Sequence, residues 1–241
     1  MYRFKRFNRG VAIGLAAIII TCVYVYWDER SFQKDTDVIR GVIESYLKAG
    51  EKAAVYPEAL QTMERPLTGE EKQQIINRSI KVISDYWQEE ATGFRMSYYR
   101  NKAGMLSGIR NNMFNDIGAY NDSGWSYYRP DKAGYVSKAS FTIKEAEPAK
   151  KVAPKCAMLT VQLVRTYHFQ GEVHTFGPVG GFVWANGFND EEVKNHAQQL
   201  YAMTLDSEVN FYLTLTDSGW KIFEMTGGDD NFFGTTRPVN T

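Results

Sequence analysis

An uninterrupted apolar run near the start of the chain limits the possible folds more than any other feature. It extends from Gly10 to Trp27 as GVAIGLAAIIITCVYVYW and contains no charged residue. A helix of this length approaches the roughly 30 Å thickness of a bilayer's hydrocarbon core. Its aromatic end suits the membrane interface. The run therefore predicts a transmembrane helix over 10–27, with bilayer contacts that include Gly10, Ile18, Ile19, Ile20, Tyr26 and Trp27.

The charges around this run predict its orientation. Residues 1–9 carry four basic side chains, and no acidic residue precedes Asp28. Positively charged flanks stay on the cytoplasmic side of a membrane. We therefore expect a cytoplasmic basic tail at 1–9 and an extracytoplasmic domain after the span, at the inner (plasma) membrane of a bacterium.

A cleaved signal peptide and a lipoprotein signal are the two alternatives to an uncleaved anchor. A cleaved signal peptide needs small residues of the A-x-A type after its apolar stretch. Thr21-Cys22-Val23 does not supply them, and bulky aromatic residues follow. A lipoprotein signal would place its modified cysteine after a small residue, and Cys22 follows Ile-Ile-Thr. The sequence favours an uncleaved signal anchor.

Charge content argues against a nucleic-acid partner, and cysteine content argues against a disulfide in the domain. The chain has 28 basic and 28 acidic residues, and four of the basic ones precede the span, so the remainder is mildly acidic. Such a domain has no electrostatic reason to bind a phosphate backbone, and no nucleic acid is expected. Cys156 is the one cysteine after the span, so that part of the chain forms no internal disulfide and relies on its core.

The first part of the domain has a helical period. After a polar stalk at 28–36, apolar residues recur at helical spacing over 38–47. A second helix begins at Thr68, which with Glu71 matches a capping box. A third helix is predicted within 93–135, where several glycines weaken the pattern.

The period then changes to two, which predicts strands. Residues around Phe141 alternate, and 157–169 form a long strand with apolar side chains at its odd positions. Gln170-Gly171 predicts a hairpin turn into a return strand that reaches Trp184, with GPVGG as a bend. The polar even positions of the long strand include Thr160, Gln162, Thr166 and His168.

The C-terminal part combines a helix, a hairpin and a tail. Asn189 and the acidic residues after it predict a helix over 190–202. Two closing strands meet at the tetrapeptide DSGW, 217–220, because Asp and Gly suit the backbone angles of tight turns. The glycine-rich tail at 227–241 is predicted to be irregular.

Helices followed by long antiparallel strands describe an α+β domain, here over 37–226. The early helix IRGVIESYLKAG and the closing hairpin FYLTLTDSGWKIFEM resemble the nuclear-transport-factor-like and SnoaL-like cone-fold superfamily. The resemblance covers about 36–226 and implies about three helices packed on a bent antiparallel sheet. The helix at 190–202 departs from that pattern. Enzymes of this superfamily use a carboxylate, His or Tyr inside the cone for proton transfer.

The architecture as a whole is also similar to another group of proteins. A cytoplasmic N-terminus, one span and such a domain resemble the bitopic assembly component of type IV secretion and conjugation machines. That resemblance implies a scaffolding domain without a catalytic site.

Few side chains suggest chemistry. Arg165 is the one charged residue on the apolar face of its strand, where it could bind an anion or extend to solvent at a sheet edge. His168 and His174 flank the predicted turn, but exposed strand positions explain them as well, and no metal site is expected. An aromatic cluster could line a ligand pocket or a protein interface; it comprises Tyr98, Tyr99, Tyr120, Trp125, Tyr127 and Tyr128.

The sequence contains no Gly-rich phosphate loop, no GxSxG and no HExxH. We therefore assign no catalytic residue and expect no cofactor. The prediction is a membrane-anchored domain with a non-catalytic docking or envelope-assembly role. Its partners would be the bilayer, through 10–27, and other envelope proteins or a second copy of the chain. The alternative is small-molecule binding, or isomerase or hydrolase activity, in the pocket of the cone.

Overall fold

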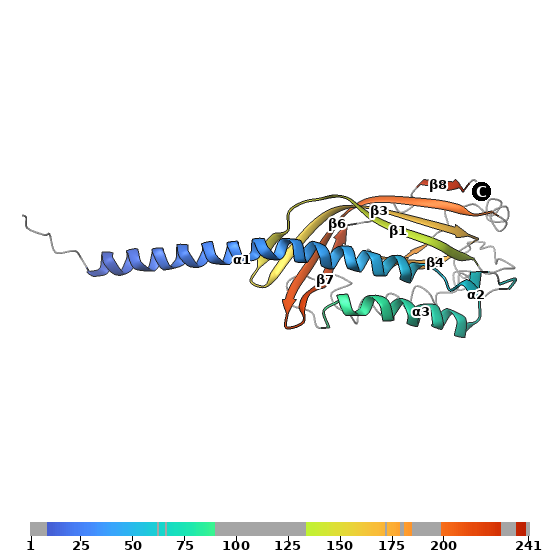
Figure 1. Ribbon diagram of the computed structural model, residues 1–241, viewed down its shortest axis with the longest axis horizontal. Coiled ribbons are helices and arrows are strands. Elements are labelled where there is room, and N and C mark those ends of the chain that lie inside the picture. Colours follow the sequence, from blue (N-terminus) through green and yellow to red (C-terminus); the bar gives the residue numbers. More distant parts are fainter. Residues whose placement is uncertain are drawn as a thin grey trace, which may run out of the picture. The chain divides into compact units, whose positions relative to one another are not determined.

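The computed structural model describes residues 9–61, 63–65, 67–89, 134–171, 173–178, 181–184, 199–227 and 235–239 (Figure 1). The chain divides into two compact units, one that ends at Val38 and one that begins at Ile39. A long apolar helix, an antiparallel sheet and further helices make up the described residues. This confirms the predicted α+β class.

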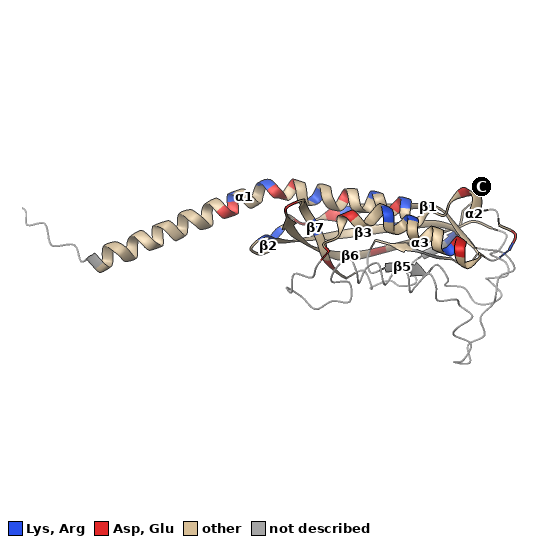
Figure 2. Cartoon of the chain, turned by 90° about the horizontal axis from the view of Figure 1, so that it is seen from below, with Lys and Arg blue, Asp and Glu red and all other residues tan. Residues whose placement is uncertain are grey.

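The first helix, α1 (Arg9–Ala54), contains the predicted span. One 18-residue window of it has a mean hydropathy of 2.1, and none of that window is buried. From Gly10 to Trp27, α1 carries no acidic or basic residue, and Figure 2 shows this part of the helix in tan. The large apolar side chains of this half are exposed; they include Ile18, Ile19, Ile20, Tyr26 and Trp27. The helix is a candidate membrane span, as expected for a single-pass membrane protein.

Two further helices follow, α2 (Glu58–Gln61) and α3 (Gly69–Ile83), the latter continued by the 3-10 turn η1 (Ser84–Tyr86). The predicted capping box at the start of α3 is confirmed. The Thr68 hydroxyl accepts the Glu71 N–H at 3.3 Å, and the Glu71 carboxylate accepts the Thr68 N–H at 2.8 Å. Both carboxylate oxygens of Glu71 also accept hydrogen bonds from Arg65, each at 2.8 Å.

These contacts predict an unusual titration of Glu71. The hydrogen bonds from Arg65, followed by that from the Thr68 backbone, lower its pKa to about 2. Because this value lies below the ordinary one, the stability that the carboxylate contributes is present above about pH 4 and is lost as pH falls through about 2. Arg65→Gln removes the largest cause, so the Glu71 midpoint should rise toward its ordinary value in carboxyl-detected NMR. Arg40→Gln, at an exposed arginine of α1, should leave it unchanged. If the pKa of Glu71 in the wild type were near 4, the hydrogen bonds from Arg65 and Thr68 would not form in solution as described.

The main sheet has the order β1-β3-β6-β7, and every pairing in it is antiparallel. Its long central strands, β3 and β6, pair from Cys156↔Thr214 to Phe169↔Tyr201. Two short strands add to this path, β2 beside β3 and β8 beside β6. The bounds are β1 Tyr135–Ala146, β2 Lys150–Ala153, β3 Cys156–Gln170, β6 Tyr201–Thr216, β7 Gly219–Gly227 and β8 Thr235–Pro238.

The core lies between one face of this sheet and the helices. The odd residues of β3 are buried along its length, as the alternation predicts. Tyr46 of α1 lies at the centre, fully buried, with its ring against those of Tyr86, Trp87, Phe176 and Phe211. The Ser79 hydroxyl donates to the Ala53 carbonyl at 3.0 Å and joins α3 to the end of α1.

The outer edge of β1 is held by groups from α1 and from the residues just after it. The Phe141 N–H donates to Glu51 Oε1 at 3.0 Å, and the Tyr56 N–H donates to the Val136 carbonyl at 2.9 Å. Lys48 forms an ion pair with the same Glu51 carboxylate at 2.5 Å. Backbone groups that an edge strand would leave unpaired are therefore partly satisfied by side chain and loop.

Two glycines of β7 need their backbone conformation for different reasons. Gly219, in the hairpin turn predicted at DSGW, has φ +100° with no atom near an added Cβ. Gly227 has φ +86°, and a Cβ there would overlap the Glu208 carbonyl oxygen. Gly219→Ala should cost about 1 kcal/mol of unfolding free energy, and Gly227→Ala about 2 kcal/mol or more, because it adds a steric clash to the backbone strain. Urea unfolding of both variants checks the order, and equal costs would contradict it.

The prediction that the segment after β3 returns along β3 as a hairpin strand is wrong. Residues His174–Gly177 (β4) pair with Gly181–Trp184 (β5) as a separate two-stranded sheet. The reason is that both edges of β3 are already occupied, by β1 on one side and by β6 on the other. The glycine-rich GPVGG segment joins β4 to β5 and does not bend a single long strand.

Two further expectations are corrected in the C-terminal part. Tyr201 and Ala202 belong to β6, so the predicted helix over 190–202 does not include them; residues 185–198 lie outside the described residues. The tail at 227–241, predicted to be irregular, contains β8. Among the described residues, β7 pairs with β6 from Val209 onward, and β8 pairs with the start of β6, Tyr201–Thr204. The helix predicted within 93–135 falls almost wholly outside the described residues.

Candidate functional site

The sequence-predicted site residues Arg165 and His168 lie on opposite faces of β3. Odd residues of this strand are buried against the core, and even residues point to the other face. Arg165 therefore belongs to the packed interior, and His168 to the face opposite the core. The structure does not bring these two side chains together.

Arg165 is buried within the sheet, with 4% of its surface exposed. Its guanidinium donates a hydrogen bond to the Ser207 hydroxyl of β6 at 3.0 Å. Because β3 is an interior strand, Arg165 does not reach solvent at a sheet edge, one of the two roles that the sequence allows for it. Its binding of an anion stays a prediction.

Two buried tyrosines, Tyr167 and Tyr46, donate hydrogen bonds to backbone carbonyls. The Tyr167 hydroxyl donates to Phe176 at 3.4 Å, and the Tyr46 hydroxyl donates to Pro178 at 3.0 Å. Burial raises the pKa of Tyr167 well above its ordinary value, and the nearby charge of Arg165 lowers it by a smaller amount. Burial also raises the pKa of Tyr46. Both phenols stay protonated at neutral pH, which suits structural hydrogen bonding rather than proton transfer.

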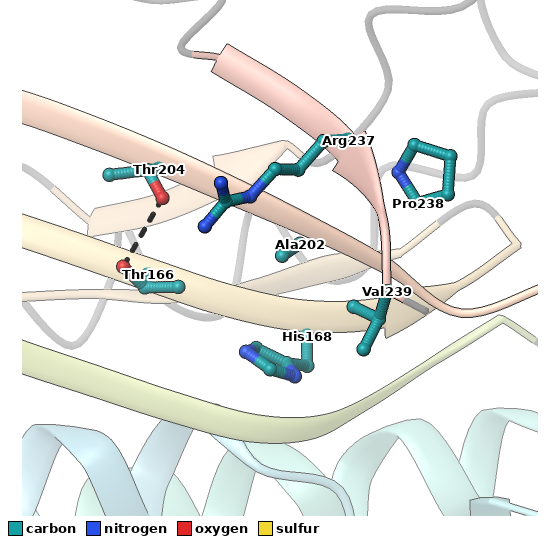
Figure 3. A pocket seen from close by; sticks show the side chains of 7 residues that line it. All are labelled: Thr166, His168, Ala202, Thr204, Arg237, Pro238 and Val239. Atoms are coloured by element: carbon teal, nitrogen blue, oxygen red, sulfur yellow. Dashed lines mark hydrogen bonds between the residues drawn. The ribbon is translucent and has the colours of Figure 1, made fainter. Parts of the chain in front are cut away.

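A pocket of about 340 Å³ lies on the face of the sheet that carries His168 (Figure 3). This volume falls in the range of small-molecule sites. Three strands build it, because Thr166 and His168 come from β3, Thr204 from β6 and Arg237 from β8. Ala202, Pro238 and Val239 complete its lining and form its apolar part.

Strand register explains why these side chains meet. On β3 and β6, Thr166 pairs with Thr204, and their hydroxyl oxygens lie 3.3 Å apart. On β6 and β8, Ala202 pairs with Arg237, which places Arg237 on the same face. Figure 3 shows the guanidinium of Arg237 extending toward the two threonines, with the His168 ring on the other side of Ala202.

The electrostatics of the pocket favour negative charge. Lys138 of β1 is the cross-strand partner of His168, and Arg237 is an exposed cation at the pocket wall. Partial burial, and then the charge of Lys138, hold the pKa of His168 below its ordinary value. His168 is therefore neutral at pH 7 and gains a proton more readily if an anion binds nearby.

Sequence reasoning identified His168 but missed the rest of the pocket. In the sequence, Thr166 stands out only as a polar even position, and Arg237 lies in a tail whose composition predicts irregular structure. A polar face on the long strand was the available signal. The aromatic candidates Tyr98, Tyr99, Tyr120, Trp125, Tyr127 and Tyr128 lie outside the described residues, as does the side chain of His174. Among described residues, no group of three or more His, Cys, Asp or Glu side chains could hold a metal ion.

Comparison with known proteins does not identify the chain. No protein-family model matches it, and no curated protein matches it. A crystal structure of a proposed aromatic ring hydroxylase from Novosphingobium aromaticivorans aligns with a TM-score of 0.42 at 12% identity, over 86% of this chain and 94% of that one. The function is therefore inferred from the residues of this chain.

Proposed function

We propose that this chain is a single-pass membrane protein whose domain docks onto neighbouring envelope proteins or a second copy of itself, without a catalytic role. The observation that carries the proposal is the first half of α1, where an 18-residue window has a mean hydropathy of 2.1 and none of it is buried. Such a surface is stable in a bilayer and unfavourable in water. Tethering would confine the domain to the membrane surface and raise its effective concentration for partners there.

The proposed organisation follows from the charges beside the span. The basic tail at 1–9 would stay in the cytoplasm, and the domain at 37–226 would lie outside the inner membrane of a bacterium. Residues 28–36 would link the two as a stalk, and 227–241 would follow the domain as a tail that includes β8.

The proposed similarity to the SnoaL-like superfamily is supported by helices packed on one face of an antiparallel sheet, whose long strands bend in Figure 1. The interior of the described part of the domain contains buried aromatic rings, among them Tyr46, Tyr167 and Phe211. An interior occupied by protonated phenols supports a structural role for the domain, similar to that of the bitopic assembly component of type IV secretion systems.

Membrane orientation is tested by cysteine labelling of the full-length chain. Cys156 is buried and Cys22 lies in the proposed span, so both should react poorly with a membrane-impermeant maleimide. A cysteine at the exposed position Glu145 of β1 should be labelled from outside spheroplasts, and one at Asn8 only after permeabilisation. The reverse pattern would refute the proposed orientation.

Docking is tested by photocrosslinking in intact membranes. A photoreactive phenylalanine analogue replaces Tyr127 or Tyr128, and Lys150, an exposed residue of β2, provides the control position. We expect discrete protein adducts, to a second copy or to another envelope protein, from the aromatic positions and not from the control. If none of these positions gives a protein adduct, the docking role is rejected.

A second candidate function is small-molecule binding, which the pocket at His168 and Arg237 favours. In this case the ligand site lies on the sheet face opposite the packed core, and not inside the cone. Isomerase or hydrolase activity would need a proton-transfer group, and His168 is the titratable side chain of this pocket with a pKa shifted below its ordinary value.

A further inference from the structure

We propose that the pocket between β3, β6 and β8 binds a small organic carboxylate, with Arg237 as the charged anchor and an apolar wall for a short hydrocarbon body. The inference rests on the second candidate function and specifies its ligand. Its residues come from segments far apart in the chain, and β8 completes the site from the sheet edge.

The first step concerns the polar end of the pocket. The hydroxyls of Thr166 and Thr204 lie 3.3 Å apart, so one of them donates its hydrogen to the other. The accepting hydroxyl then keeps its own hydrogen for a ligand, since each hydroxyl carries a single donor. The guanidinium of Arg237 extends toward this pair. Together they present donors from two directions to one negatively charged group, and a guanidinium fork matches the two oxygens of a carboxylate.

The second step concerns competition from the protein's own acids. No ion pair of Arg237 is present within the described part of the chain. The closest acidic position along the same face of β6 is Asp206, whose carboxylate accepts a hydrogen bond from Gln162 and lies 3.7 Å from Lys144 Nζ. Asp206 therefore has partners of its own, which leaves Arg237 available for an external anion.

The third step distinguishes a carboxylate from an inorganic anion. Ala202, Pro238 and Val239 give the pocket an apolar wall beside its polar end. An inorganic phosphate would leave this wall in contact with water, whereas the carbon chain of an organic acid would cover it. The volume of about 340 Å³ accommodates a molecule of this size.

The fourth step predicts how binding depends on pH. The charged groups that face His168 are Lys138 from β1 and Arg237 from β8, and its β6 neighbour Ala202 is neutral. A bound carboxylate would offset these positive charges and favour protonated His168. Affinity should therefore increase as pH falls from about 7.5 to about 5.5, a range in which most carboxylic acids stay ionised.

The test uses the full-length chain in detergent micelles, with butyrate, inorganic phosphate and butylamine as probes. Binding is measured by saturation-transfer NMR of the organic probes and by the ¹³C shift of histidine rings, with His168 assigned through His168→Gln. We expect saturable butyrate binding that tightens at lower pH, weaker binding of phosphate and none of butylamine. Arg237→Gln should weaken butyrate binding by about tenfold or more, because a charge-assisted fork is lost.

The matched control is Arg40→Gln, the same substitution at an exposed arginine of α1, which should leave butyrate affinity unchanged. Arg237 is exposed, so its variant should fold, and the His168 resonance verifies an intact pocket. Equal affinity in Arg237→Gln, tighter binding of phosphate than of butyrate, or no saturable binding would each overturn the proposal. Protein adducts from Tyr127 without butyrate binding would leave the docking role standing and reject this ligand, so the two failures are distinguishable.

Discussion

Replacement of Tyr46 by alanine should lower the free energy of unfolding by about 3–5 kcal/mol, the range measured for deletion of a buried aromatic ring. Tyr46 has no exposed surface, and its ring is surrounded by those of Tyr86, Trp87, Phe176 and Phe211. These neighbours belong to different elements, with Tyr86 in η1, Phe176 in β4 and Phe211 in β6. Movement of one side chain therefore cannot close the cavity. A loss of this size is a large fraction of the roughly 5–15 kcal/mol by which native domains are stable.

The variant Tyr46→Phe separates the ring from its hydroxyl. It keeps the aromatic packing but removes the donor to the Pro178 carbonyl, a bond of 3.0 Å. An unpaired buried carbonyl costs about 1–3 kcal/mol, so this variant should lie between wild type and alanine. The order of the two variants identifies packing as the larger contribution.

Urea unfolding of the full-length chain in micelles, followed by tryptophan fluorescence, measures both changes. Val38→Ala, at a residue of the same helix that is 54% exposed, is the control and should change stability by less than about 0.5 kcal/mol. If Tyr46→Ala costs no more than Tyr46→Phe, the packing of α1 on the sheet differs from the arrangement described above.

The second large effect concerns the membrane. Lysine at both Ile18 and Ile19 should abolish stable integration of the chain into the bilayer. These positions lie near the middle of the apolar run, and a charged side chain at the centre of a span costs about 2.5–3.5 kcal/mol on insertion scales. Side chains placed so far from either interface have little opportunity to extend into water.

Carbonate extraction of isolated membranes measures integration. Wild type should stay in the pellet, and the double variant should appear in the supernatant or be degraded. Val38→Lys adds a charge to the same helix at an exposed position beyond the run and should behave as wild type. Retention of Ile18→Lys/Ile19→Lys in the pellet would show that residues 10–27 are not the anchor.

The parts of this fold that sequence predicted correctly depend on local interactions. The capping box at Thr68 depends only on two residues three positions apart. The turn at 217–220 depends only on the Asp and Gly within that tetrapeptide. The alternation in 157–169 records burial on one face and was equally readable. The predicted aromatic cluster cannot be compared in the same way, because it lies outside the described residues.

The parts that sequence missed depend on which strand edges are available. Pairing of β4 with β5 follows from the occupation of both edges of β3, one of them by a strand that begins only at Tyr201. β8 pairs where β7 leaves β6 uncovered, and Arg237 enters the pocket only through that pairing. The position of Arg237 depends on where β7 stops pairing with β6, and no residue pattern near Arg237 indicates that point. The candidate site therefore could not be predicted from sequence alone.

The side chain of Glu51 at the edge of β1 has a consequence for the behaviour of many copies in one membrane. An open strand edge is a template for pairing with the same edge of another molecule. Copies held in a membrane meet far more often than free ones, because diffusion is limited to two dimensions. The Glu51 carboxylate accepts the Phe141 N–H and forms an ion pair with Lys48. It therefore places charge where the backbone of a neighbouring molecule would have to bind. Glu51 thus occupies a backbone donor of this strand edge, which would oppose edge-to-edge stacking of copies crowded in one membrane.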